Sequence, residues 1–146
     1  MRILTLSIVL LLLTLSAAAQ SSEQKTEIEN EILAVMMTQA GAWNRGDIEG
    51  FMQGYWKSEK LVFASGDNIT RGWQPTLDRY KKTYGTRAKM GELAFTDLEI
   101  TVLSKDAAVV LGSWSLKREA DNPKGKFTLI FRRLKEGWRI VHDHTS

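Results

Sequence analysis

The chain closes with Trp138-Arg139-Ile140-Val141-His142-Asp143-His144-Thr145-Ser146, nine residues that alternate in the way a β-strand does. An uninterrupted strand would carry on one face Trp138, Ile140, His142 and His144. The other face would carry Asp143. The only two histidines of the 146-residue chain would then lie side by side near the end of a closing strand. If the protein has a polar site, we expect it to include His142 and His144.

The first 19 residues have the features of a secretory signal peptide. Arg2 gives a positive start, residues 3–15 form an apolar run, and Ala17-Ala18-Ala19 supplies the small residues that a signal peptidase recognises. The apolar run is shorter than the roughly 20 residues that a membrane-spanning helix needs. We therefore predict a periplasmic or secreted protein that starts at Gln20 and has no membrane attachment once the signal is removed.

Residues 20–146 are enough for a single domain with one core. The chain has no cysteine, which excludes disulfides, thiol nucleophiles and cysteine metal sites. Its 20 basic and 17 acidic residues are spread along the sequence, a pattern that does not suggest nucleic-acid binding. Phosphate-binding glycine loops, nucleophile elbows and His-Glu-x-x-His helices are not found in the sequence. We predict no cofactor.

Three helices are predicted in the first part of this domain. Apolar residues recur at helical spacing between Ser21 and Arg45, and Gly46 suits the position that ends a helix. Asp47 can cap a second, short helix. A third follows Gly72, with an apolar stripe made by Trp73, Leu77, Tyr80 and Tyr84.

The remainder of the sequence has the period of two that is typical of strands. Two short strands are predicted at residues 61–64 and 69–71, and four long ones lie between Leu93 and Thr145. Leu93 and Phe95 are apolar on a face that later turns acidic, so we expect a bulge or bend near Thr96-Asp97. These elements predict an α+β domain, with three helices packed on a strongly curved, mostly antiparallel sheet and a concave pocket between them.

Three segments, in this order, resemble landmarks of one protein superfamily. They are Asn44-Arg45-Gly46-Asp47-Ile48-Glu49-Gly50, then Gly72-Trp73, then Gly137-Trp138-Arg139-Ile140-Val141-His142-Asp143-His144. Together they are similar to the nuclear-transport-factor-2-like (NTF2-like) superfamily, particularly its SnoaL-like and DUF4440 branches. The last segment also resembles the association domain of calcium/calmodulin-dependent kinase II. The resemblance implies a cone-shaped α+β fold with a deep pocket and a homodimer formed through the sheet.

The resemblance does not imply one chemistry, because this fold hosts isomerases, dehydratases, hydrolases, binding proteins and assembly domains. Ketosteroid isomerase, a member of the superfamily, uses a tyrosine, a carboxylate base and a second acid. An alignment anchored on Asn44-Arg45-Gly46-Asp47 places Gln39 at the position of the tyrosine and Phe63 at that of the base, and the second acid falls near Thr128. None of the three roles is filled, which argues against that activity.

The two histidines have three interpretations. They are structural residues at a strand end, or pocket groups that bind a ligand or act as a general acid and base, or a metal-binding pair. No further His or Cys can complete a metal site, and we predict no metal. Aromatic residues on the apolar stripes belong either to the core or to the wall of a ligand pocket, namely Tyr55, Phe63, Trp73, Tyr80 and Trp114.

Two classes of function therefore remain open. The favoured one is an exported pocket protein that binds a small apolar or aromatic molecule. The alternative is a small-molecule isomerase, dehydratase or hydrolase that uses His142 or His144 as acid and base.

Overall fold

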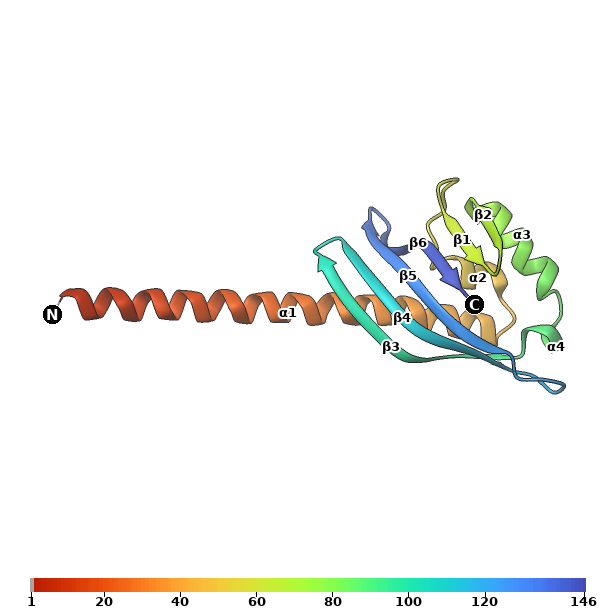
Figure 1. Cartoon of the computed structure of the whole chain (residues 1–146), viewed down its shortest axis with the longest axis horizontal. Helices are drawn as coiled ribbons and strands as arrows, with labels where there is room; N and C mark the ends of the chain where they lie inside the picture. The colour runs from red at the N-terminus through yellow and green to blue at the C-terminus, as the bar shows by residue number, and fades with distance from the viewer. Residues whose placement is uncertain (1) are drawn as a thin grey trace.

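The computed structural model describes the backbone of residues 2–146 and the side chains of residues 21–146. The predicted signal peptide, residues 1–19, lies outside the described side chains. The elements are, in order, α1 (Arg2–Asn44), α2 (Ile48–Met52), β1 (Val62–Ser65), β2 (Asn68–Arg71), α3 (Trp73–Thr83), α4 (Arg87–Met90), β3 (Glu92–Ser104), β4 (Ala107–Lys117), β5 (Lys124–Leu134) and β6 (Gly137–Thr145) (Figure 1). Within the described part of the chain, no helix is long and apolar enough to cross a membrane.

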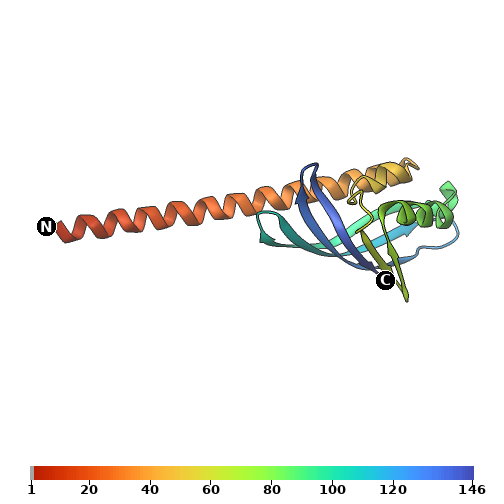
Figure 2. The same ribbon diagram turned by 90° about the horizontal axis from the view of Figure 1, so that it is seen from above.

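The strands form one six-stranded sheet in the order β2-β1-β6-β5-β4-β3. Each neighbouring pair is antiparallel except β1 and β6, which run parallel. The long strands β3, β4 and β5 bend strongly along their length (Figure 1), and the helices lie on one side of the curved sheet (Figure 2). The predicted α+β class with a mostly antiparallel, curved sheet is confirmed.

A bulge in β3 lies where the sequence predicts one. The pairing of β3 with β4 shifts between Thr96 and Glu99, and Asp97 has a positive φ of 54°. The inward-facing side chains are Leu93 and Phe95 before the shift and Leu98 and Ile100 after it. The bulge therefore keeps apolar residues on the inner face along the whole strand.

A second bulge, in β6, is not predicted by the sequence. Phe131 of β5 pairs with Ile140, but the adjacent Ile130 pairs with His142, so Val141 has no partner on β5. One extra residue on a strand reverses which side chains face inward beyond it. Trp138, Ile140 and Asp143 are buried, whereas His142 is half-buried and His144 is exposed.

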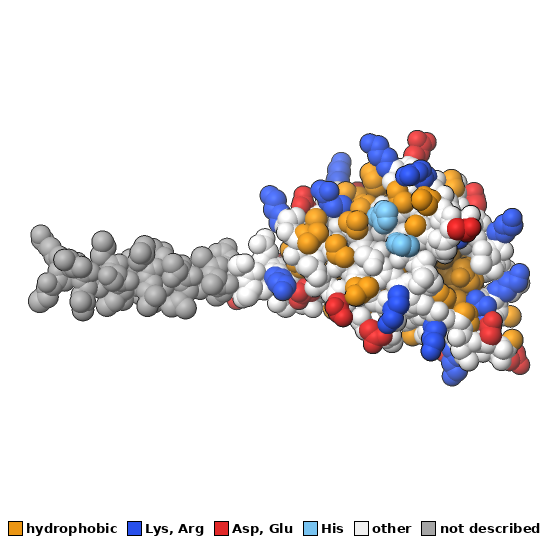
Figure 3. Space-filling view, viewed as in Figure 1, with side chains coloured by type: hydrophobic (Ala, Val, Ile, Leu, Met, Phe, Trp, Pro, Cys, Tyr) orange, Lys and Arg blue, Asp and Glu red, His pale blue; other side chains and the backbone are white. Residues whose placement is uncertain are grey.

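The expectation that the two histidines share a face with Trp138 and Ile140 is thus corrected. It assumed strict alternation along β6, and the unpaired Val141 interrupts that alternation. Both histidines lie on the outer face of the sheet, next to hydrophobic side chains (Figure 3).

The helical hairpin forms as its turn residues predict. The Asp47 carboxylate accepts a hydrogen bond of 2.7 Å from the backbone N–H of Gly50, which caps α2. Gly46 between the two helices has a φ of 84°, a conformation that glycine adopts without strain. The turn is short, so α2 packs back against the end of α1.

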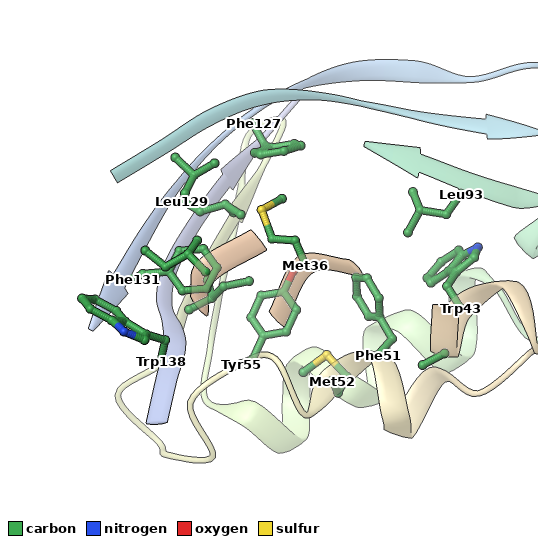
Figure 4. Packing of buried hydrophobic residues seen from close by; sticks show 14 of the residues in the cluster. Met36, Trp43, Phe51, Met52, Tyr55, Leu93, Phe127, Leu129, Phe131 and Trp138 are labelled. Atoms are coloured by element: carbon green, nitrogen blue, oxygen red, sulfur yellow. The ribbon is translucent and has the colours of Figure 1, made fainter. Parts of the chain in front are cut away.

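The core lies between the helices and the inner face of the sheet. In Figure 4, Met36 of α1 points toward side chains of β5 such as Phe127 and Leu129. The indole N–H of Trp138 donates a hydrogen bond of 2.8 Å to the Glu31 carboxylate, which joins β6 to α1. The side chains do not fill all of the space between the helices and the sheet, and a cavity remains there.

Candidate functional site

A cavity of about 280 Å³ lies between α1, α2 and α3 and the inner face of the sheet. Its lining is mostly aromatic and aliphatic. The lining includes four of the aromatic residues that the sequence predicts to belong to the core or to a pocket wall, Tyr55, Phe63, Tyr80 and Trp114. They come from the segment after α2, from β1, from α3 and from β4, so the fold brings together residues that are far apart in the sequence.

The helical wall of the cavity is a connected group of aromatic rings. Trp43 contacts Phe51 edge-on at 5.1 Å between ring centroids and Tyr84 at 4.9 Å. Tyr80 lies 5.2 Å from Phe51 and 5.5 Å from Phe63. Such edge-to-face contacts add about 0.5–1.5 kcal/mol each beyond the area they bury. The wall is therefore rigid as well as apolar.

Backbone hydrogen bonds hold the segment around Tyr55 against β6. The N–H of Ile140 donates to the carbonyl of Gly54, and the N–H of Trp56 donates to the carbonyl of Ile140, both at 2.9 Å. A side chain at position 54 would collide with the buried Gln39 of α1, so glycine allows this close approach. Tyr55 is thereby fixed beside the strand that carries Asp143.

Asp143 is the only acidic side chain that lines the cavity, and it is 4% exposed. Its Oδ2 accepts a hydrogen bond of 2.7 Å from the hydroxyl of Tyr55. Its Oδ1 is buried and has no hydrogen-bond partner among the described residues. Burial raises the pKa of this carboxyl from 3.8 to about 7, and the hydrogen bond from Tyr55 acts in the opposite direction.

Two tyrosine hydroxyls extend from Asp143 along the cavity. The hydroxyl oxygens of Tyr55 and Tyr80 are 3.5 Å apart, a long contact. Because a hydroxyl has one proton and Tyr55 donates its own to Asp143, Tyr80 is the donor in this contact. Burial is the main cause that raises the pKa of both phenols, and the nearby Asp143 carboxyl raises it further. Both tyrosines therefore stay protonated over the ordinary pH range.

One cationic side chain, Arg79 of α3, also lines the cavity. Its Nη1 donates to the hydroxyl of Thr70 at 3.2 Å, and its guanidinium lies 5.1 Å from the centre of the Phe63 ring. The sequence gives no sign that Arg79 lines a cavity, because a single arginine on a helix is common.

Three of the residues that the sequence predicts as possible pocket residues do not line the cavity. Trp73 is buried, and its indole N–H donates a hydrogen bond of 2.9 Å to the carbonyl of Met52, so it joins α3 to α2. His142 and His144 lie on the opposite face of the sheet. Asp143, predicted on the face of the strand opposite to the two histidines, lines the cavity instead of them.

The described side chains offer no cluster of three or more His, Cys, Asp or Glu that could hold a metal ion. The polar groups of the cavity are suited instead to hydrogen bonding and proton transfer. Asp143 can donate or accept a proton near neutral pH, and the Tyr80 hydroxyl, whose contact with Tyr55 is long, can donate to an oxygen atom of a ligand instead.

The family model of the SnoaL-like domain matches residues 32–146, which span the whole cavity. The chain belongs to the SnoaL-like domain family. Of the two branches that the sequence resembles, this match supports the SnoaL-like one. A comparison with proteins of curated function found no match.

Solved structures with the same fold agree with this assignment. An NTF2-like protein of unknown function from Shewanella oneidensis MR-1 is 44% identical, with a TM-score of 0.78, over 81% of this chain and 98% of that one. An NTF2-like superfamily protein from Salmonella enterica is 20% identical, with a TM-score of 0.67, over 84% and 92%. A putative calcium/calmodulin-dependent kinase II association domain from Xanthomonas campestris is 14% identical, with a TM-score of 0.62, over 80% and 84%. This SnoaL-like domain therefore has the NTF2-like fold.

The raised pKa of Asp143 predicts a particular pH dependence of stability. The carboxyl has a pKa of about 7 in the folded protein and 3.8 as its ordinary value, so folding takes up a proton between these pH values. The contribution of Asp143 to stability is complete below pH 3.8 and is lost as the pH rises through 7. We expect the free energy of unfolding of the wild type, relative to Asp143→Asn, to fall by up to about 4 kcal/mol between pH 4 and pH 8.

Urea unfolding of both proteins across this pH range measures the difference between their free energies of unfolding. The exposed carboxylates are the same in both proteins, so their effect cancels in this difference. His144→Gln serves as a control, because His144 is exposed on the outer face. A wild type and an Asp143→Asn variant with parallel pH profiles would show that Asp143 titrates as an ordinary exposed carboxyl.

Proposed function

We propose that this SnoaL-like domain is an exported protein that binds one small, largely apolar molecule in the cavity and holds a polar group of that molecule at Asp143. The observation that carries the proposal is the unpartnered Oδ1 of Asp143 at the end of an aromatic pocket. A buried polar atom without a partner costs roughly 1–3 kcal/mol. A ligand that supplies the missing hydrogen bond offsets that cost.

The size and polarity of the cavity restrict the ligand. A volume of about 280 Å³ is at the lower end of the usual range for small-molecule pockets, about 300–1,000 Å³. The aromatic wall suits a flat or cyclic apolar body. The group at Asp143 is a carbonyl when the carboxyl is protonated, or a hydroxyl when it is ionised.

Acid–base chemistry on the bound molecule is a second candidate function, and the pKa of Asp143 favours it. A group with a pKa of about 7 is populated in both protonation states at neutral pH, which suits a general acid or base. Asp143 would take a proton from the ligand and return it to another atom. The Tyr80 hydroxyl, whose contact with Tyr55 is long, would turn to donate to an oxygen that gains negative charge, while Tyr55 keeps its hydrogen bond to Asp143. This assigns to Asp143 the isomerase, dehydratase or hydrolase role that the sequence analysis considered for the histidines.

Ligand retention tests the proposed function. We expect protein purified from its source to carry a small molecule that is visible by native mass spectrometry. Asp143→Asn should lower the occupancy of this molecule at a given ligand concentration, because an amide replaces the carboxyl group that binds the polar group of the ligand. We expect the affinity of the variant for the ligand to be about 5- to 150-fold weaker. His144→Gln, on the outer face, should leave the occupancy unchanged.

Loss of the small molecule in His144→Gln but not in Asp143→Asn would contradict the proposal. A wild-type protein that never carries a small molecule and binds none added to it would contradict it as well.

We further propose that the domain forms a homodimer through the outer face of its sheet. Leu111 of β4 is 44% exposed there, beside the half-buried Val109 and Ile130. Charged residues at both ends of this strip are already paired, Lys126 with Asp97 and Arg132 with Asp106, each at 3.6 Å. A two-fold contact of the strip with itself therefore buries apolar surface. Glu99 of β3, the exposed register partner of Leu111, forms no salt bridge among the described residues, so it has to lie at the edge of that contact.

A pair of matched substitutions tests the assembly. Leu111→Glu should convert a dimer into a monomer, because it places a charge on each side of the two-fold contact. Met37→Glu is the control, since Met37 is 67% exposed on α1 and lies away from the sheet face. Light scattering that finds the wild type monomeric at micromolar concentration, or Leu111→Glu still dimeric, would count against this interface.

A further inference from the structure

Arg79 is the only Lys, Arg or His among the residues that line the cavity. Its position on α3 is half-buried, and among the described side chains it forms no salt bridge. Arg79 therefore carries a positive charge at the cavity that no acidic side chain of the described chain neutralises.

Most of the hydrogen-bonding capacity of this guanidinium is also free. An arginine has five N–H donors, and the one hydrogen bond of Arg79 goes to the neutral hydroxyl of Thr70. The Phe63 ring lies against the guanidinium, so the side chain has a defined position. An arginine held in this way is prepared to bind a planar anion through two parallel hydrogen bonds.

The groups around Arg79 are hydroxyls. Thr83 is one helical turn further along α3 and also lines the cavity. Ser65 follows Phe63 on the inner face of β1, and it pairs with Thr145 of β6. Together with Arg79 these hydroxyl side chains form a polar rim that, among the described residues, contains no Asp or Glu side chain. Ser146, the last residue of the sequence, lines the cavity as well.

Arg79 and Asp143 are linked through aromatic side chains. Phe63, against whose ring Arg79 lies, is the register partner of Asp143 in the pairing of β1 with β6. Arg79 contacts Phe63, Phe63 contacts Tyr80, and the hydroxyl of Tyr80 reaches that of Tyr55, which donates to Asp143. A molecule that lies against these rings therefore meets both a cation and a buried carboxyl.

We propose that the ligand of this cavity is an amphipathic monocarboxylate, whose carboxylate pairs with Arg79 while its cyclic or aryl body lies on the aromatic wall and approaches Asp143. This rests on the proposed binding function and names the class of its ligand. One guanidinium matches one carboxylate in charge and geometry, whereas a phosphate dianion would bring a second negative charge that the rim does not neutralise.

The test compares two probes of nearly the same shape, 4-phenylbutanoate and 4-phenylbutanamide, by titration calorimetry with the mature chain. The wild type should bind the acid at least tenfold more tightly than the amide. Arg79→Gln should remove this preference, and Arg79→Lys should retain part of it, because lysine keeps the charge but loses the planar fork. Arg71→Gln is the control, since Arg71 is exposed on β2 and does not line the cavity. Thermal unfolding verifies that each variant is folded.

The outcomes separate the two proposals. Equal affinity for acid and amide in the wild type, or an acid preference that survives in Arg79→Gln, overturns the carboxylate inference but leaves a pocket that binds neutral molecules. A wild type that binds neither probe, at any concentration up to their solubility, overturns the carboxylate inference. The proposed function fails only if native mass spectrometry of the purified protein also finds no retained small molecule.

Discussion

The site depends on a single extra residue in the last strand. Ile140 is hydrogen-bonded to Gly54 and Trp56 on one side and pairs with Phe131 on the other, so its position is fixed. Val141 then has no partner, and the strand resumes pairing with its faces exchanged. This exchange turns Asp143 into the cavity and leaves both histidines on the outer face. Without it, the aromatic pocket would have no acidic side chain.

The low polarity of the cavity determines the pKa and the hydrogen bonding of its few polar groups. Asp143 is surrounded by aromatic and aliphatic side chains, and the loss of water is what brings its pKa to about 7. Tyr55 supplies one hydrogen bond to the carboxyl, which leaves the other oxygen for a ligand. Arg79 donates a hydrogen bond to the hydroxyl of Thr70 and forms no salt bridge among the described side chains. The cavity therefore offers two polar groups of different kinds, a cationic side chain and a buried carboxyl.

The sequence predicts most of the fold but only part of the site, and the two bulges show why. In β3 the apolar positions change from Leu93 and Phe95 to Leu98 and Ile100, so the change of face is visible in the hydrophobic pattern. In β6 the residues after Val141 are polar on both faces, and no apolar side chain marks the change. Aromatic stripes correctly indicate that Tyr55, Phe63, Tyr80 and Trp114 face inward, but they do not distinguish pocket from core. Trp73 lies on the same stripe as Tyr80 and packs in the core instead.

The most direct test of this account is the pKa of the Asp143 side chain itself. A carbon-13 NMR titration of its carboxyl carbon, assigned by comparison with Asp143→Asn, gives that value in the folded protein without any ligand. We expect a midpoint at about pH 7, because the bulge at Val141 places the carboxyl in the aromatic cavity. A midpoint near the ordinary value of 3.8 would mean that Asp143 faces solvent, and it would contradict both the reversal of β6 and the site built on it.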